Sequence, residues 1–208
     1  MDIKDQFKAL RTLEVLPESE QRKLDIKSVK LGGFIELNND IWKVINHYSY
    51  LDVKWANFAK RKKDYWMIEL GLLSLTTGKK TCVEWKIDDE LEISLTDSFI
   101  KIRDIQFNNK SLTRSDIDFI EDEEEGQVKI NGAIYHYSDD DTWAGLFYKT
   151  EQDAKTKVNG SPLKVYEFES DKEEYLSIEM WHDKNEKAER EAYVSHSIKT
   201  TDIKVLQQ

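Results

Sequence analysis

Two glutamates, Glu84 and Glu179, are the side chains of this sequence best placed by type and spacing to do acid–base chemistry. They occupy equivalent positions in two similar segments, TCVEW at 81–85 and LSIEMW at 176–181. Two carboxylates that a twofold arrangement brings together could serve as a general acid and a general base. Duplication of a segment also repeats a glutamate without any catalysis, so this pair is an alternative hypothesis and no catalytic residue is assigned.

Other reactive side chains lack the spacing that chemistry requires. The four histidines, His47, His136, His182 and His196, form no ligand motif of the i, i+4 kind, and the single cysteine, Cys82, has no cysteine partner. The acidic stretch SDDDTW at 138–143 lacks the alternating ligand spacing of a calcium loop and is predicted to be a solvated turn. No metal site and no cofactor is predicted.

The elements that carry the two glutamates recur along the chain. Two segments contain, in the same order, a glycine, an Asn-Asn or Asn-Gly pair, and an Ile followed by an aromatic residue. They are GFIELNNDIWKV at 33–44 and GQVKINGAIYHY at 126–137. These Asn turns favour the type I′ geometry, so both segments are predicted to form the same β-hairpin. IKIRDI at 100–105 returns as IKTTDI at 198–203, and several such matches in one order indicate an internal duplication.

Alternation within each copy separates an apolar from a polar face. In one segment Val83, Trp85 and Ile87 share a face and Glu84, Lys86 and Asp88 share the other. In the other segment Leu176, Ile178 and Met180 share a face that is opposite to Glu179 and Trp181. Trp85 is therefore predicted in the core and Trp181 on an exposed face.

The predicted fold is mainly β, with two pseudo-repeated antiparallel β units, each a small barrel or half of a sandwich. A short N-terminal helix is predicted to cover a core, because Ile3, Phe7, Leu10 and Leu13 follow helical spacing. The predicted divisions are a helix and linker at 1–29, a first β unit at 30–113, an acidic linker at 114–125 and a second β unit at 126–208. The acidic run Glu121–Glu125 within the linker is predicted to bury nothing.

Charge and composition narrow the classes of partner. The 208 residues include 41 Asp and Glu against 31 Lys and Arg, a formal net charge of −10. Such a field repels phosphate backbones and anionic lipid surfaces, so nucleic acid is not a predicted partner. No apolar run of about 18 residues is present, which argues against membrane insertion and favours a cytoplasmic location.

Several motifs give the chain a resemblance to a known family. They are GxxxxxNNxIWxV from Gly32, VEWKIDDELEISL at 83–95, and VYEFES, YLSIEMW and EAYVSHSIKTTDIKVL in the second copy. Over residues 30 to 206 the chain resembles a bacterial family known as domain of unknown function 4178. The resemblance implies an accessory protein encoded beside phage-shock-type membrane-stress proteins, and it implies no catalytic residues.

The function expected from the sequence is that of a non-enzymatic accessory or adaptor protein that binds a protein partner, in a membrane-stress response. The residues assigned to partner binding are Tyr175, Glu179, Trp181, Tyr193 and Glu84, since exposed aromatic residues on an acidic surface suit a basic or apolar patch. One alternative is an inhibitor or immunity protein steered by its acidic charge onto a basic target. A further alternative is an enzyme that uses Glu84 and Glu179.

Overall fold

The computed structural model describes residues 3–182 and 190–208. The helices are α1 (Ile3–Leu10), α2 (Glu18–Gln21), α3 (Arg114–Asp122) and α4 (Glu151–Thr156), with short 3-10 turns η1 (Ile26–Ser28), η2 (Trp55–Asn57), η3 (Ile102–Asp104) and η4 (Thr200–Asp202). The strands are β1 (Phe34–Leu37), β2 (Asp40–Lys54), β3 (Ala59–Lys60), β4 (Trp66–Ser74), β5 (Lys80–Ile87), β6 (Leu91–Ile100), β7 (Gln106–Phe107), β8 (Lys110–Ser111), β9 (Gln127–Ile130), β10 (Ala133–Tyr148), β11 (Ser161–Glu169), β12 (Glu174–Trp181), β13 (Arg190–Ser197) and β14 (Ile203–Gln207). Within the described ranges, every helix is too short or too polar to cross a membrane.

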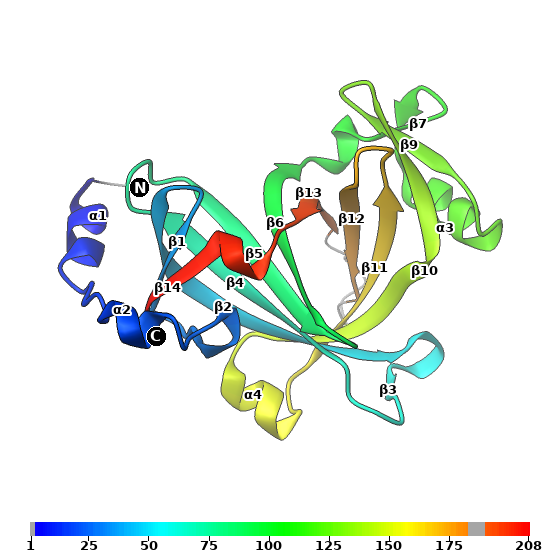
Figure 1. The fold of residues 1–208 in the computed structure, drawn as a ribbon. Coiled ribbons are helices and arrows are strands. Elements are labelled where there is room, and N and C mark those ends of the chain that lie inside the picture. Colours follow the sequence, from blue (N-terminus) through cyan, green and yellow to red (C-terminus); the bar gives the residue numbers. More distant parts are fainter. Residues whose placement is uncertain (1–2, 183–189) are drawn as a thin grey trace.

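Eight strands close into an antiparallel barrel, so the fold is mainly β as predicted. Their order is β2, β4, β5, β6, β13, β12, β11, β10, and β10 then pairs with β2 through Phe147 and Tyr50. Each copy contributes four of these strands, and in Figure 1 β4 and β5 lie on the left while β11 and β12 lie on the right. A barrel of eight strands can fill its interior with side chains or hold one small ligand.

Both predicted hairpins are confirmed. β1 and β2 meet at Asn38 and Asn39, with φ of 53° and 59°, and β9 and β10 meet at Asn131 and Gly132, with φ of 50° and 87°. Positive φ at both central positions defines the type I′ turn, whose twist matches that of the strands it joins.

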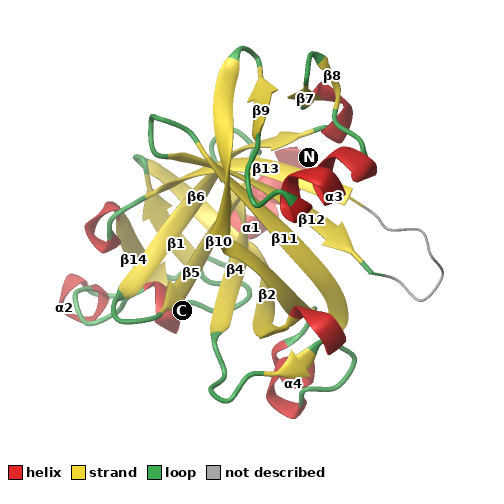
Figure 2. Ribbon diagram, turned by 90° about the vertical axis from the view of Figure 1, so that its right-hand side faces the viewer, coloured by secondary structure: helices red, strands yellow, loops and turns green. Residues whose placement is uncertain are grey.

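Each unit has its own apolar core, which lies outside the barrel wall. The hairpin of each unit packs against the strands that follow it. Figure 2 shows the strands of both units crossing the middle of the molecule, with α2, α3 and α4 at its periphery. The first core includes Ile35, Val44, Leu70, Val83 and Leu95. The second core includes Val128, Tyr135, Phe168, Ile178 and Val194. Because these core residues of the barrel strands face outward, the residues next to them in each strand face the barrel interior.

The two copies exchange their last strands. β14, at the end of the second copy, pairs with β1 of the first, so that Val205 is opposite Ile35. β7, at the end of the first copy, pairs with β9 of the second, so that Gln106 is opposite Lys129. The repeated IKxxDI motif comes just before each exchanged strand. One continuous sheet therefore runs through both units.

Most of the segment 114–125, predicted to be an acidic linker, is helical. Residues 114–122 form α3, which begins with a capping box between Thr113 and Asp116. Ile117 and Ile120 are fully buried in the second core. Their spacing of three residues turns both side chains to one face of the helix, and this apolar face outweighs the repulsion along the acidic run.

The N-terminal helix is confirmed and ends at Leu10, but the two apolar side chains of the helix whose exposure the structure describes do not cover a core as predicted. The side chains of Phe7 and Leu10 are 57% and 44% exposed. Leu13, beyond the helix, packs against buried Phe34 and Leu206. The apolar contact of this segment with the barrel is therefore made after the helix rather than by it.

Candidate functional site: the interior of the barrel

The first unit contributes two carboxylates to the barrel interior. Leu70 on β4 and Val83 on β5 are fully buried in the outer core. Alternation along each strand then turns Glu69 and Glu84 to the inner side, where the two residues pair directly across the ladder. These two side chains face inward because the apolar residue next to each of them faces outward.

The second unit contributes two more carboxylates by the same rule. Phe168 on β11 and Ile178 on β12 belong to the outer core. Glu167 and Glu179, their neighbours, line the interior cavities. The duplication therefore places acidic residues from both copies in one barrel.

Two cavities of about 630 Å³ and 300 Å³ occupy the barrel, and Tyr50 and Glu84 line both. The smaller cavity is lined by residues that include Tyr48, Glu69, Cys82, Phe147, Glu179, Trp181 and Tyr193. The larger cavity is lined by residues that include Trp143, Glu167, Tyr175, Ser177 and Ser195. Volumes of this size suit a small molecule.

The carboxylates of the first unit have neutral hydrogen-bond donors. Tyr50 Oη donates to Glu69 Oε2 at 2.7 Å, and the Cys82 thiol donates to Glu69 Oε1 at 3.3 Å. A hydrogen bond from Tyr193 favours the charged form of Glu84. These contacts give the carboxylate oxygens hydrogen-bond donors, but they bring no positive charge to neutralise the carboxylates.

Glu167 and Glu179 of the second unit differ in their contacts. Ser177 Oγ donates to Glu167 Oε2 at 2.7 Å. Glu179 is only 4% exposed, yet among the described residues its carboxylate has neither a hydrogen-bond donor nor a cation within ion-pair distance. Glu191, its direct partner across the ladder, is another carboxylate. Glu179 is therefore a buried acid without a partner on the wall of the smaller cavity.

Burial and mutual repulsion raise the pKa values of these acids. Desolvation, followed by the charges of Glu69 and Glu167, raises the pKa of Glu84 to about 8. Desolvation also raises the pKa of Glu167 to about 7. The pKa of Glu179 lies well above its usual range because of burial and then the charges of Glu69 and Glu84. A carboxyl group in such surroundings holds its proton near neutral pH unless a cation approaches.

Aromatic rings form a further part of the interior wall. Phe147 lies 4.9 Å from Trp181, 5.1 Å from Tyr48 and 5.3 Å from Tyr50, measured between ring centroids. Tyr50 also contacts Trp143 edge to face at 6.1 Å. The barrel therefore combines carboxylates with aromatic rings, the two kinds of group that attract organic cations.

The residues predicted from sequence to bind a partner are placed on the inner wall. Glu84, Glu179, Trp181 and Tyr193 line the smaller cavity, and Tyr175 lines the larger one. Trp181, predicted on an exposed face, is half-buried against Phe147. Trp85, predicted in the core, is half-buried against the first apolar core.

Sequence reasoning missed Glu69, Glu167 and Tyr50. For the two glutamates a signal was present, since each directly precedes a residue that alternation assigns to the core, Leu70 and Phe168. That signal shows a polar face, but it does not show that the face is closed into a barrel.

The histidines lie apart from this cluster. His182 packs against Trp55 and Phe58, and burial lowers its pKa. His196 Nδ1 lies 2.7 Å from a carboxylate oxygen of Asp97. In the part of the chain that the structure describes, no three His, Cys, Asp or Glu side chains are arranged to hold a metal ion.

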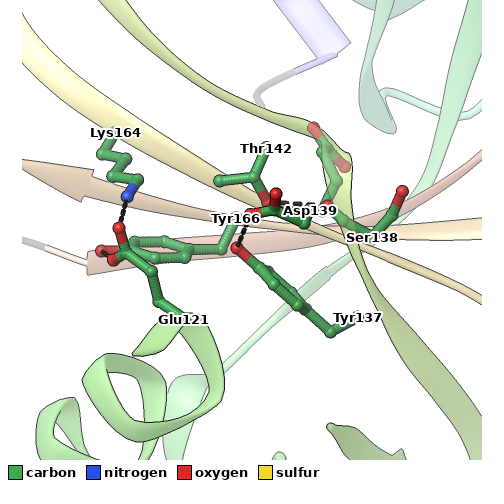
Figure 3. A network of polar contacts seen from close by, with 8 residues as sticks. Glu121, Tyr137, Ser138, Asp139, Thr142, Lys164 and Tyr166 are labelled. Atoms are coloured by element: carbon green, nitrogen blue, oxygen red, sulfur yellow. Dashed lines mark hydrogen bonds and ion pairs between the residues drawn. The ribbon is translucent and has the colours of Figure 1, made fainter. Parts of the chain in front are cut away.

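A second polar network lies outside the barrel and ties α3 to β11 (Figure 3). Lys164, which is 5% exposed, forms an ion pair with Glu121, and Tyr166 Oη donates to the same carboxylate at 3.0 Å. The Lys164 ammonium also lies 4.4 Å from the ring centroid of Trp55. Its lysine and its carboxylate neutralise each other, so loss of either partner would leave an uncompensated buried charge.

One comparison with known proteins identifies the family of the chain. Residues 30–200 match the family described as Domain of unknown function (DUF4178). The chain belongs to this family. No curated protein and no solved structure matches the chain. In this DUF4178 protein the matched range contains every strand of the barrel, and it leaves out α1 and the exchanged strand β14.

Proposed function

We propose that this protein binds a small organic cation with a primary ammonium group inside the barrel. The observation that carries the proposal is Glu179, a carboxylate that is 4% exposed, lines the smaller cavity and has no donor or cation among the described residues. Leaving such a group charged and unpaired costs several kcal/mol, roughly, in a protein interior. A bound ammonium ion supplies the missing partner.

The other wall residues support the same class of ligand. An ammonium ion has three N–H donors, and Glu69 and Glu84 offer further acceptor oxygens beside Glu179. Tyr50 and Phe147 present aromatic rings to the same cavity, where cation–π attraction adds to the ion pair. A cavity of about 300 Å³ accommodates an amine with an apolar or aromatic body.

The enzyme alternative, with Glu84 and Glu179 as acid and base, has weaker support. The pKa of Glu84 is raised to about 8, which suits a general acid at neutral pH. The pKa of Glu179 is raised well above its usual range as well, so the pair lacks an ionised base unless a cation is bound. Ligand binding therefore comes before any catalysis by these two residues.

The adaptor and inhibitor roles, and the cytoplasmic location, stay predictions. Glu84, Glu179 and Tyr193 are at most 9% exposed and line the barrel interior. A protein partner would reach them only by inserting a segment into the barrel, and a lysine side chain has the same ammonium chemistry as the proposed ligand.

The test is a titration of the protein with benzylammonium and with benzyl alcohol, a neutral molecule of nearly the same shape, followed by tryptophan fluorescence and calorimetry. We expect benzylammonium to bind and benzyl alcohol to bind at least about tenfold more weakly, since one charge-assisted hydrogen bond contributes roughly 1.5–3 kcal/mol. Glu179→Gln removes this preference. Glu125→Gln, an exposed acid outside the barrel, is the matched control and keeps it. Equal binding of the two compounds, or no binding of either, contradicts the proposal.

A further inference from the structure

The acidic segment SDDDTW forms a bulge in β10. β10 runs from Ser138 to Trp143 while its partner β11 advances only from Glu167 to Val165, so extra residues of β10 are displaced from the ladder. Bulges of this kind re-aim side chains at the rims of barrels. Asp139, Asp140 and Asp141 are the displaced acids, and all three are exposed.

Specific contacts hold the bulge in place at the larger cavity. Thr142 Oγ1 donates to the Ser138 carbonyl at 2.9 Å, and Tyr137 Oη donates to Asp139 Oδ1 at 3.4 Å, as Figure 3 shows. Asp140 and Asp141 line the larger cavity together with Glu84 and Glu167. The bulge therefore presents negative charge at an opening that leads to the buried carboxylates.

The charges of the bulge are not neutralised by ion pairs, unlike those of two other acids of this rim. Asp52 is paired with Arg61 at 2.8 Å, and Glu92 is paired with Lys86 at 3.1 Å. Among the described residues, Asp139, Asp140 and Asp141 form no ion pair. Asp88 and Glu169, which also line the larger cavity and are exposed, form no ion pair among the described residues either, so the bulge shares the unpaired negative charge of this rim with them.

The lining of the smaller cavity is less acidic toward solvent. Among the residues that the structure describes, its exposed charged residues are Lys149 and Glu191, one of each sign. A cation approaching the barrel therefore meets net attraction at the larger opening and a near balance at the smaller one.

We propose that cations enter the barrel through the larger opening and that the bulge at Asp139–Asp141 draws them in. This inference rests on the proposed function and assigns the route and the residues that select for charge. A cleft lined by one sign of charge raises the local concentration of an oppositely charged ligand and its rate of association. The acidic bulge thus acts on the rate of access, and the buried carboxylates act on retention.

Cys82 offers a direct probe of the route, because it is the only cysteine of the chain and lines the smaller cavity beyond Glu84. The reagents are 2-aminoethyl methanethiosulfonate, which carries a primary ammonium, and methyl methanethiosulfonate, which is neutral. In each reaction the Cys82 thiol loses its proton to solvent, and the thiolate attacks the sulfur atom that carries the aminoethyl or methyl group. A disulfide forms, the bond between the two reagent sulfurs breaks, and methanesulfinate leaves. The rate constant is read from the mass of the product over time.

One variant combines Asp139→Asn, Asp140→Asn and Asp141→Asn. In this variant the rate constant for the cationic reagent at Cys82 should fall by about threefold to tenfold at low ionic strength. The neutral reagent should react at an unchanged rate, which shows that the barrel and its opening are intact. The matched control combines Glu123→Gln, Glu124→Gln and Glu125→Gln, three exposed acids that do not line either cavity, and should leave both rates unchanged. High salt should remove the difference between the variants.

Two results would overturn the inference: equal slowing in both triple variants, or no slowing in the Asn variant. The proposed function is judged separately by the titration with benzylammonium. If benzylammonium fails to bind while the rates at Cys82 still depend on the bulge, the route stands and the binding site does not.

Discussion

Glu69 on β4 and Glu84 on β5 stand directly opposite each other, and both side chains point into the barrel. Like charges at directly opposed positions destabilise an antiparallel ladder. Burial raises the pKa of both carboxyl groups, and the charge of Glu69 raises the pKa of Glu84 further, so the pair reduces its repulsion by holding protons. A sheet selected for stability alone would place apolar residues here, which is why we interpret the pair as part of a binding site.

The first prediction concerns the dependence of stability on pH. The pKa of Glu84 is raised to about 8 in the folded protein, above its value of about 4.5 in the unfolded chain, so the folded state holds more protons between these pH values. The free energy of unfolding should therefore be highest near pH 5 and should fall as the pH rises toward 8. Urea denaturation at a series of pH values measures this slope.

Glu84→Gln should flatten that slope, because the substituted side chain does not titrate. Each pKa unit corresponds to about 1.4 kcal/mol, so at pH 8 the variant should be more stable than the natural protein by a few kcal/mol, roughly. Glu125→Gln is the control and should leave the slope as it is. A slope that Glu84→Gln does not change would show that this carboxyl group is not desolvated.

The second prediction concerns Tyr50→Phe. Its hydroxyl donates to Glu69 at 2.7 Å and favours the charged form of that carboxylate. Loss of the donor should lower the free energy of unfolding by about 1–3 kcal/mol, with the greater loss at alkaline pH, where Glu69 is ionised. Denaturation at acidic and alkaline pH measures both values, and an equal loss at the two pH values argues against the contact.

The third prediction concerns the exchanged strand β14. Val205 is 2% exposed and contributes to the apolar core of the first unit. Val205→Ala should lower the free energy of unfolding by about 2 kcal/mol and speed amide hydrogen exchange in β1, far away in the sequence. Lys204→Ala, on the same strand but exposed, is the control. Faster exchange confined to residues 126–208 would contradict the exchange of strands.

The hairpins and the two faces of each strand could be predicted from sequence because their causes are local. Asn38 and Asn131 tolerate positive φ, and the alternation around Val83 and Ile178 follows from the pleat of a strand. The burial of α3 was not predicted, because the acidic run favours a solvated linker. Ile117 and Ile120, three residues apart beside that run, form the buried face of the helix.

Closure of the barrel could not be predicted, because it depends on pairing between residues far apart in the chain. Phe147 meets Tyr50 across the junction of β10 and β2, and no property of either segment specifies the other as its partner. If the sheet is not closed into a barrel, Glu84 and Glu179 lie on polar outer faces. This is why the sequence assigns them to a partner-binding surface. With closure, the same two residues face one cavity.

The central claim is that the buried carboxylates bind a cation, and carboxyl carbon NMR of Glu84 and Glu179 tests it most directly. We expect titration of the free protein to show both pKa values well above 4.5, in line with their burial. Saturation with benzylammonium should lower both pKa values, because a nearby cation favours the charged form. Carboxyl groups that titrate near 4.5, or whose pKa values do not respond to benzylammonium, would contradict the account.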